Sequence, residues 1–171
     1  MGRGFTVEIK HKRIDLSVDK DYVLECHCRI NYECDTPWKR KMTYEEYRQE
    51  WFGMKTQINE FLDVLLESCK DSHSIVDIIF IKDEVAGYLW VPFFESEEND
   101  FAFAEIQDIY VEPSYRNRGI ASYLFAYAED KARQNGAKVI RSGTGCENKS
   151  SVGLHKKMGY YQYRFEFEKL F

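Results

Sequence analysis

The segment of residues 108–121 constrains this chain more than any other, because it reads as a strand, a tight loop and a helix in immediate succession. Gly119 and Ala121 leave the start of the helix without bulky side chains. Backbone NH groups at a helix start are unpaired and carry partial positive charge, so a phosphate can approach them. The segment therefore predicts a phosphate-binding loop, to which Arg116 and Arg118 add positive charge.

The apolar periodicity along the chain predicts one mixed α/β (α+β) domain over residues 1–171. Asp19 is expected to cap the first helix, and Thr43 with Glu46 forms a capping-box pattern that opens a long second helix ending near Cys69. The expected order is β-α-α-β-β-β-α-β-α-β, a mostly antiparallel central sheet flanked by helices. The strands are expected over 5–16, 75–81, 85–94, 101–111, 137–141 and 160–171, and the later helices over 118–134 and 148–158.

Length and charge exclude several classes of protein. The chain has 171 residues and a net charge of -5, whereas proteins that bind nucleic acids carry a basic face. No apolar run approaches the roughly 20 residues of a membrane helix. Four charged residues interrupt any export signal near the N-terminus, namely Glu8, Lys10, Lys12 and Arg13. We therefore expect a cytoplasmic protein whose partners include neither nucleic acid nor a membrane.

Five cysteines, an odd number in a chain without an evident export signal, predict reduced thiols rather than a disulfide framework. The group Cys26-His27-Cys28 with Cys34 raises the alternative of a zinc site. Its spacing departs from the usual two-residue gap, and no second ligand pair follows. Small buried apolar side chains on a helix are therefore favoured, and no metal is expected.

The pattern Arg116-x-x-Gly119-x-Ala121 resembles the Arg/Gln-x-x-Gly-x-Gly/Ala signature of the GNAT superfamily of N-acetyltransferases. In that family the loop holds the pyrophosphate of coenzyme A, and the similarity covers most of residues 75 to 171. The resemblance implies that acetyl-CoA is the cosubstrate. The residues implied to bind it are Ile109, Tyr110, Val111, Arg116, Asn117, Arg118, Gly119, Ile120, Ala121, Ser122, Asn148 and Ser151.

Two alternatives to an acetyltransferase stay open. The loop of residues 143–150 differs from a nucleotide-binding P-loop only by Asn148 in place of the second glycine. Only 21 residues (171 minus 150) follow it, too few for the helix and strand that would bring a magnesium-binding Asp. In the GNAT resemblance Asn148 instead reaches the pantetheine arm. The second alternative is a GNAT-fold module that binds acyl-CoA as a regulatory ligand without turnover.

The resemblance also implies a general base. A lysine-like amine has an unperturbed pKa near 10.4 and must lose a proton before it attacks. Glu105 lies 11 positions before Arg116 (116 minus 105), the offset of the general-base glutamate in the histone acetyltransferase branch. Strand alternation puts Glu105 on one face with Phe103, Gln107 and Ile109, surroundings that favour a raised pKa. A solvated surface glutamate is the equal alternative.

The leaving thiolate needs a proton, and His155 occupies the position at which the family commonly has a tyrosine acid. An imidazolium can donate that proton. A histidine that only hydrogen-bonds the sulfur, or Tyr160 or Tyr161 acting in its place, stay open. Backbone NH groups at 109–111, where the family usually has a β-bulge, would bind the oxyanion.

The implied reaction is acetyl transfer to a primary amine by direct attack in a ternary complex, and no signature identifies the amine. Four acidic residues lie just before the strand of Glu105 and can attract a cation, although a solvated loop is the alternative. They are Glu95, Glu97, Glu98 and Asp100. The aromatic residues of 160–167 are expected in the core or at the edge of a homodimer.

Overall fold

In the computed structural model, which describes residues 8–96 and 101–171, seven strands and five α-helices form a mixed α/β fold, so the predicted fold class is confirmed. Two short 3₁₀-helices lie at Lys39–Lys41 and Pro113–Tyr115. In chain order the elements are β1 (Ile9–Arg13), α1 (Leu16–Cys34), α2 (Tyr44–Gly53), α3 (Lys55–Lys70), β2 (Ile75–Ile81), β3 (Glu84–Val91), β4 (Phe93–Ser96), β5 (Phe101–Ile106), β6 (Asp108–Val111), α4 (Ile120–Gln134), β7 (Val139–Ser142) and α5 (Lys149–Lys157).

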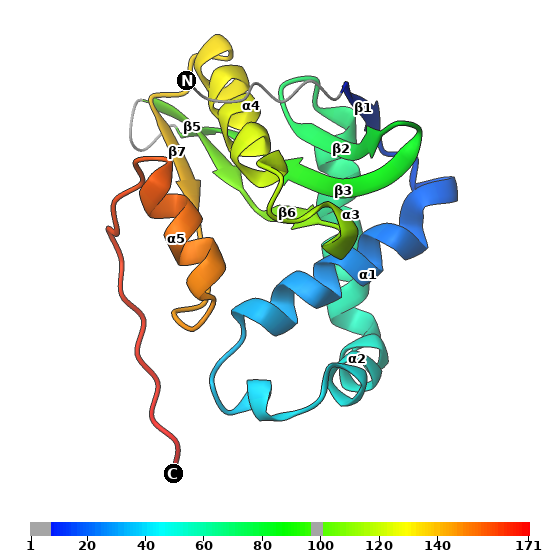
Figure 1. Cartoon of the computed structure of the whole chain (residues 1–171), viewed down its shortest axis with the longest axis vertical. Helices are drawn as coiled ribbons and strands as arrows, with labels where there is room; N and C mark the ends of the chain where they lie inside the picture. The colour runs from blue at the N-terminus through cyan, green and yellow to red at the C-terminus, as the bar shows by residue number, and fades with distance from the viewer. Residues whose placement is uncertain (1–7, 97–100) are drawn as a thin grey trace.

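The strands form two sheets, which separate just before the segment of residues 108–121 (Figure 1). The first sheet is antiparallel in the order β1-β2-β3-β6, and the second has the order β4-β5-β7. β5 pairs with β7 in parallel, and this pairing ends at Ile106 and Ser142. Because β7 stops there, the described residues give the outer edge of β6 no partner strand. A backbone edge is therefore left open beside β6.

A β-bulge causes this change of sheet. The Gln107 NH donates to the Trp90 carbonyl oxygen at 3.0 Å, although the residue that pairs with Trp90 is Asp108. Two residues therefore oppose one, and the side-chain alternation shifts by one position along the chain. The expected strand 101–111 is broken into β5 and β6 for this reason, and the bulge lies before the expected position of 109–111.

Helices cover both faces of the strands, and each face has its own apolar core. Leu124, Phe125 and Ala128 of α4 pack on one face, with α5 beside them. α1 and α3 cover the opposite face, and α2 packs outside them through Trp51. Figure 1 shows α4 in front of the strands and α3 behind them, with α1 crossing below them. β2 is buried on both faces, as expected for a strand in which six of the seven residues are apolar.

Two helix boundaries differ from those predicted. Asp15, not Asp19, caps α1, since its carboxylate accepts from the Ser17 NH. The capping box of Thr43 and Glu46 is confirmed. The predicted helix 43–69 is wrong as a single element, because it breaks at Met54 into α2 and α3. Glycine is a weak helix former, and it precedes Met54 at this break.

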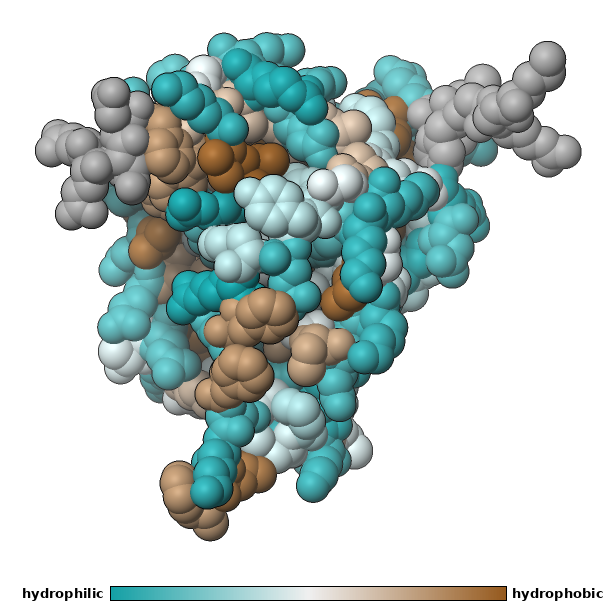
Figure 2. Space-filling model, turned by 90° about the vertical axis from the view of Figure 1, so that its left-hand side faces the viewer, coloured by the Kyte–Doolittle hydropathy of each residue, from teal (hydrophilic) through white to brown (hydrophobic). Residues whose placement is uncertain are grey.

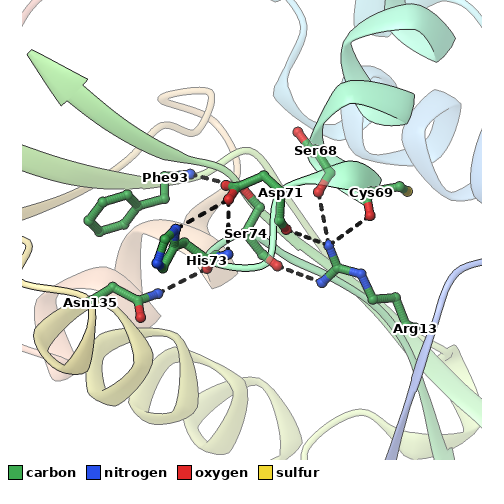
Figure 3. A network of polar contacts seen from close by, with 8 residues as sticks. All are labelled: Arg13, Ser68, Cys69, Asp71, His73, Ser74, Phe93 and Asn135. Atoms are coloured by element: carbon green, nitrogen blue, oxygen red, sulfur yellow. Dashed lines mark hydrogen bonds and ion pairs between the residues drawn. The ribbon is translucent and has the colours of Figure 1, made fainter.

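A polar network fastens the end of α3 to the neighbouring elements (Figure 3). The Arg13 guanidinium donates to the carbonyl oxygens of Ser68 at 2.9 Å, Asp71 at 2.7 Å and Ser74 at 2.6 Å. These oxygens belong to the last turn of α3 and the turn into β2, where carbonyl groups lack helical partners. Asn135, just after α4, joins the same turn by donating to the His73 carbonyl at 3.0 Å.

The predicted final strand is wrong. Residues 160–171 form neither helix nor strand, and the segment descends beside α5, away from the sheets (Figure 1). Alternate side chains are apolar and exposed, including Tyr163 at 60%, Phe165 at 67% and Phe167 at 92%. Figure 2 shows brown and tan side chains along the lower part of this face. Alternation alone does not make a strand, because a strand needs a partner.

Candidate functional site

The loop before α4 turns the start of that helix outward. Asn117 and Gly119 both have left-handed backbones, with φ of 60° and 85°. The Tyr123 NH donates to the Gly119 carbonyl at 3.0 Å, so the NH groups of residues 120–122 have no acceptor within the helix. Residues 116–119 are exposed. This arrangement suits a phosphate, as the sequence predicts.

The two arginines of the loop are held differently. Arg116 donates from Nε to the Val111 carbonyl oxygen at 2.9 Å, and its guanidinium lies 5.5 Å from the Tyr110 ring centre. Its other end is 3.7 Å from a Glu33 carboxylate oxygen. The Arg118 guanidinium lies 5.6 Å from a tyrosine ring centre and makes no hydrogen bond or ion pair with a described residue. Arg116 therefore fastens the loop to β6, and Arg118 is free to turn toward a phosphate.

α5 reaches the start of α4 through Lys157, whose Nζ donates to the Ser122 hydroxyl at 3.2 Å. Asn148 is the cap of α5, because its Oδ1 accepts from the Ser151 NH at 3.1 Å. Both Asn148 and Ser151 are partly buried. Since the helix uses Oδ1 of Asn148, the side-chain NH₂ group is the part left for a ligand.

The loop of residues 143–148 packs against α1. A Cβ atom on Gly145 would lie 2.5 Å from the carbonyl oxygen of Cys34, so only glycine permits this approach. Lys149, which a P-loop would turn to phosphate, instead donates to the Cys146 carbonyl at 3.1 Å. These contacts argue against the nucleotide-binding alternative.

The open edge of β6 carries two backbone donors. The Glu112 NH donates to the Ala86 carbonyl at 2.9 Å, toward β3. Antiparallel pairing alternates, so the NH groups of Ile109 and Val111 point to the opposite, open edge. Tyr110 differs, because its NH faces β3 and its side chain is buried under α1. Ile109 and Val111 are therefore the residues that can polarise a carbonyl group here.

Glu105 lies on β5 beside Arg141 of β7, on the face opposite the α4 core. The shifted alternation puts Asp108 on this face and Ile109 on the α4 side. The predicted common face of Glu105 and Ile109 is therefore wrong. Glu105 is partly buried, and no described residue hydrogen-bonds its carboxylate.

His155 is fixed at both ring nitrogens. Nδ1 lies 2.7 Å from the Ser151 carbonyl oxygen, an acceptor only, so Nδ1 carries a proton. Nε2 lies 2.8 Å from the Ser142 hydroxyl, and the ring meets Phe125 edge-on at 5.1 Å. Ser142 is the last residue of β7, where the open edge begins. The imidazole therefore faces that edge through the Ser142 hydroxyl.

The two alternative tyrosines are placed differently. The Tyr160 hydroxyl is buried and has no hydrogen-bond partner among the described residues, and burial raises the pKa of Tyr160. Tyr161 is 84% exposed. Neither therefore has the ordered connection to the open edge that His155 has.

A histidine–aspartate pair that sequence reasoning missed lies on the α1 side. His27 Nδ1 is 2.8 Å from Asp108 Oδ2, and Asp108 is 2% exposed. The neighbouring Cys26 and Cys28 pack into two separate core clusters. The prediction that Cys26 and Cys28 are buried apolar side chains is confirmed. Burial raises the pKa of the Cys26 thiol to about 12, so it stays protonated.

A cavity of about 380 Å³ lies between α1 and α2. Its lining is mixed, with aromatic, amide and charged side chains, and Lys39 forms an ion pair with Glu50. The residues that line the cavity include Asn31, Asp35, Tyr47, Glu50, Trp51 and Gln57. Of the acidic run expected to attract a cation, Glu95 is described, whereas Glu97, Glu98 and Asp100 lie outside the described residues. No helix in the described ranges is long and apolar enough to cross a membrane.

Known proteins resemble this chain in sequence over part of their length. An uncharacterised N-acetyltransferase of Methanocaldococcus jannaschii is 32% identical over 71 residues, 42% of this chain and 30% of the relative. The aminoalkylphosphonate N-acetyltransferase of Salmonella typhimurium is 37% identical over 65 residues, 38% of this chain and 42% of the relative. The matches thus span less than half the length of these relatives.

Solved structures share the fold along nearly the whole chain. An aminoglycoside N-acetyltransferase in complex with CoA has a TM-score of 0.59 at 16% identity, covering 99% of this chain and 98% of its own. Glucosamine-6-phosphate N-acetyltransferase from Arabidopsis thaliana has a TM-score of 0.58 at 14% identity, covering 96% and 99%. The model of the acetyltransferase (GNAT) family matches residues 40–160, which include the loop, the bulge and α5. The chain therefore belongs to the acetyltransferase (GNAT) family.

Proposed function

We propose that this chain transfers an acetyl group from acetyl-CoA to a primary amine, by direct attack in a ternary complex. The observation that carries the proposal is the exposed start of α4, where left-handed Asn117 and Gly119 leave the NH groups of residues 120–122 unpaired. Such a site suits a pyrophosphate. Because the chain belongs to this family, coenzyme A is the molecule expected to supply the pyrophosphate.

The residues present fit coenzyme A along its length. The pyrophosphate would lie against residues 116–122, with Arg118 free to pair with it. The pantetheine arm would run along the open edge of β6, between that edge and α5. The Asn148 side-chain NH₂ and the Ser151 hydroxyl stand on the α5 side of this path.

The chemistry needs polarisation of the thioester carbonyl, removal of a proton from the amine and a proton for the thiolate. The NH groups of Ile109 and Val111 would polarise the thioester carbonyl. Glu105 is the base and His155 the acid that the family resemblance suggests. Both roles stay predictions.

The acceptor is proposed to be a cationic amine. The cavity between α1 and α2 presents two carboxylates, Asp35 and Glu50, and one lysine. Glu95 lies at the end of β4, next to the β5 strand that carries Glu105. The named relatives act on amines of different kinds, an aminoalkylphosphonate and aminoglycosides. Their diversity leaves the acceptor to experiment.

A homodimer is also proposed. Among the described strands β7 pairs only with β5, so its other edge is open. Residues 160–171 offer a row of exposed aromatic side chains in β-like alternation, and such a segment can add to an open edge of a second copy. A cytoplasmic location stays a prediction, since the reaction needs a compartment that supplies acetyl-CoA.

One experiment tests the proposed function. Acetyl-CoA consumption is measured over a panel of polyamines, aminoglycosides, amino acids and peptide N-termini, with acetyl-CoA and ATP binding measured side by side. Turnover with at least one amine supports the transferase. Acetyl-CoA binding without turnover on the whole panel would favour a regulatory module, and ATP binding without acetyl-CoA binding would favour the nucleotide site.

A further inference from the structure

We propose that the imidazole of His27, oriented by Asp108, takes the proton from the attacking amine, in the role that the resemblance gives to Glu105. The inference rests on the proposed function of acetyl transfer. It assigns a site residue from α1, a helix that carries no recognisable motif.

The hydrogen bond to Asp108 fixes the form of the imidazole. His27 Nδ1 is 2.8 Å from Asp108 Oδ2, and an ionised carboxylate accepts but does not donate. Nδ1 therefore carries the proton in neutral imidazole, and Nε2 keeps its lone pair. A carboxylate that holds an imidazole in this form is a recurrent device of proton-transfer sites.

Aromatic rings fix the plane of the imidazole. Phe61 of α3 stacks on it at 3.9 Å between ring centres and 19° between planes, and Trp51 of α2 meets it edge-on at 5.8 Å. The His27 side chain is still 18% exposed. No described residue hydrogen-bonds Nε2. A small amine can therefore reach a base that needs little reorganisation.

The bulge places this pair beside the proposed oxyanion donors. Asp108 is the second bulge residue and directly precedes Ile109, whose NH points to the open edge. His27 lies on the opposite face of β6 from α4. The amine would thus approach from the α1 side, and the thioester from the open edge. Glu105 lies before the bulge and lacks any such ordered partner in the described chain.

The cavity between α1 and α2 lies further along α1 from His27. His27 and Asn31 are one helical turn apart and share a side of α1, and Trp51 both touches the imidazole and lines the cavity. The body of an acceptor held in the cavity can therefore present its amine to His27. This placement connects the base to a mixed cavity on the same side of the strands.

Few charges surround the imidazole. Asp108 faces it from β6, and Tyr88 of β3 and Cys26 of α1 adjoin that carboxylate. Burial, with the charge of Asp108, raises the pKa of Tyr88 well above its ordinary value. Tyr88 and Cys26 thus stay neutral near pH 7. α2 and α3 contribute aromatic rings, so Asp108 is the charged group that faces His27 among these contacts.

The amine nitrogen lone pair forms a bond to the thioester carbonyl carbon, and the C=O electron pair moves onto oxygen. The proton on nitrogen passes to His27 Nε2, which gives imidazolium. Collapse of the oxyanion breaks the C–S bond, the electron pair leaves on sulfur, and the thiolate takes a proton from the acid of the site or from water.

The test compares His27→Asn with His11→Asn. Asparagine can keep a donor near Nδ1 but has nothing at Nε2. His11 is a matched control, because it also pairs with a carboxylate, Asp77, at 3.2 Å, yet its Nε2 bonds the Tyr123 hydroxyl on the far face. We expect His27→Asn to lower kcat/KM by the 10²- to 10⁴-fold that is typical of a lost general base. The rising limb of the pH profile that an imidazole base gives should disappear. The rise in melting temperature that acetyl-CoA binding causes should stay unchanged. His11→Asn should retain activity.

Asp108→Asn tests the positioning role, and is expected to lower kcat while leaving the KM for acetyl-CoA unchanged. Hydroxylamine, a weakly basic nucleophile that is neutral near pH 7, should lose much less rate in His27→Asn than a polyamine does. Full activity in His27→Asn with an unchanged pH profile would overturn the inference, and so would equal losses in the two histidine variants.

A measurement without turnover keeps the inference separate from the proposed function. Nitrogen-15 NMR of histidine-labelled protein reports which ring nitrogen carries the proton. Neutral His27 protonated at Nδ1 supports the assignment, and protonation at Nε2 refutes it whatever the activity. If acetyl-CoA does not bind and no amine is acetylated, the proposed function fails, and the inference fails with it as a catalytic role.

Discussion

Gly119 and Gly136 stand just outside the two ends of α4 with nearly the same left-handed backbone, φ 85° and 81°. A bulky side chain is strained at either position, but only Gly119 belongs to the exposed loop. Gly119→Trp should therefore abolish the stabilisation by acetyl-CoA. Gly136→Trp, where a Cβ meets nothing within 4 Å, should lower the melting temperature and keep the ligand-induced shift.

The expected shift is measurable. At a hundredfold excess over its dissociation constant, acetyl-CoA should stabilise the wild type by about 2.7 kcal/mol. For a chain of this length that is roughly a 5 to 10 °C rise in Tm, read by differential scanning fluorimetry. An undiminished shift in Gly119→Trp would mean that another part of the chain holds the cofactor.

Local features of the fold could be predicted from sequence because they depend on a few neighbouring residues. The capping box of Thr43 and Glu46 closes within four residues. The loop around Gly119 can be predicted from that glycine and the small residues next to it. The observed start of α1 lies four residues before the predicted one, because Asp15 and Asp19 are both reasonable caps and only the tertiary contacts decide between them. Asp19 is instead paired with Lys12.

Features that join distant residues could not be predicted. The bulge exists because Trp90 of another strand faces both Gln107 and Asp108, so its position depends on a register that no local pattern contains. His27 and Asp108 are 81 positions apart. The sequence around His27, a lone histidine between two cysteines, does not indicate this pair. Asp108 does give a signal, because an aspartate buried at the start of an apolar strand needs a polar partner.

Glu105→Gln decides between the base suggested by resemblance and the base inferred from the structure. If Glu105 takes the proton, kcat/KM should fall by 10²- to 10⁴-fold and partly recover at high pH, where more of the amine is already neutral. If His27 does so, the loss should be much smaller than in His27→Asn. The pH dependence of kcat/KM for both variants, measured with the same amine, separates the two roles.

A cationic acceptor should respond to salt. Attraction by the carboxylates of the cavity and by Glu95 is screened as ionic strength rises, so KM for the acceptor should increase while KM for hydroxylamine changes little. Glu50→Gln should weaken both the affinity and its salt dependence. A best acceptor that is neutral or anionic would contradict this prediction.

The exposed C-terminal segment should control association. Wild-type protein is expected to have twice the chain mass in light scattering, and a variant ending at Tyr160 should have the mass of one chain. Replacing Tyr163, Phe165 and Phe167 by serine should act like the truncation, because it removes the apolar face and keeps the length. A monomeric wild type at high concentration would exclude the proposed dimer.

His155 should reveal its role through the alkaline side of the pH profile. Its Nε2 reaches the open edge through Ser142, and an imidazolium in this place can supply the proton that the leaving thiolate needs. If it does, wild-type activity should fall at alkaline pH, and His155→Ala should lose most activity when departure of the thiolate limits the rate. His155→Tyr restores the residue common in the family and should move the alkaline limb upward, toward the ordinary phenol pKa near 10.

Ser142→Ala should share the defect of His155→Ala, because it removes the connection between the imidazole and the open edge. If His155→Ala keeps full activity with an unaltered alkaline limb, the hydrogen bonds of His155 to Ser151 and Ser142 serve only to hold α5 against β7, and solvent becomes the better source of the proton.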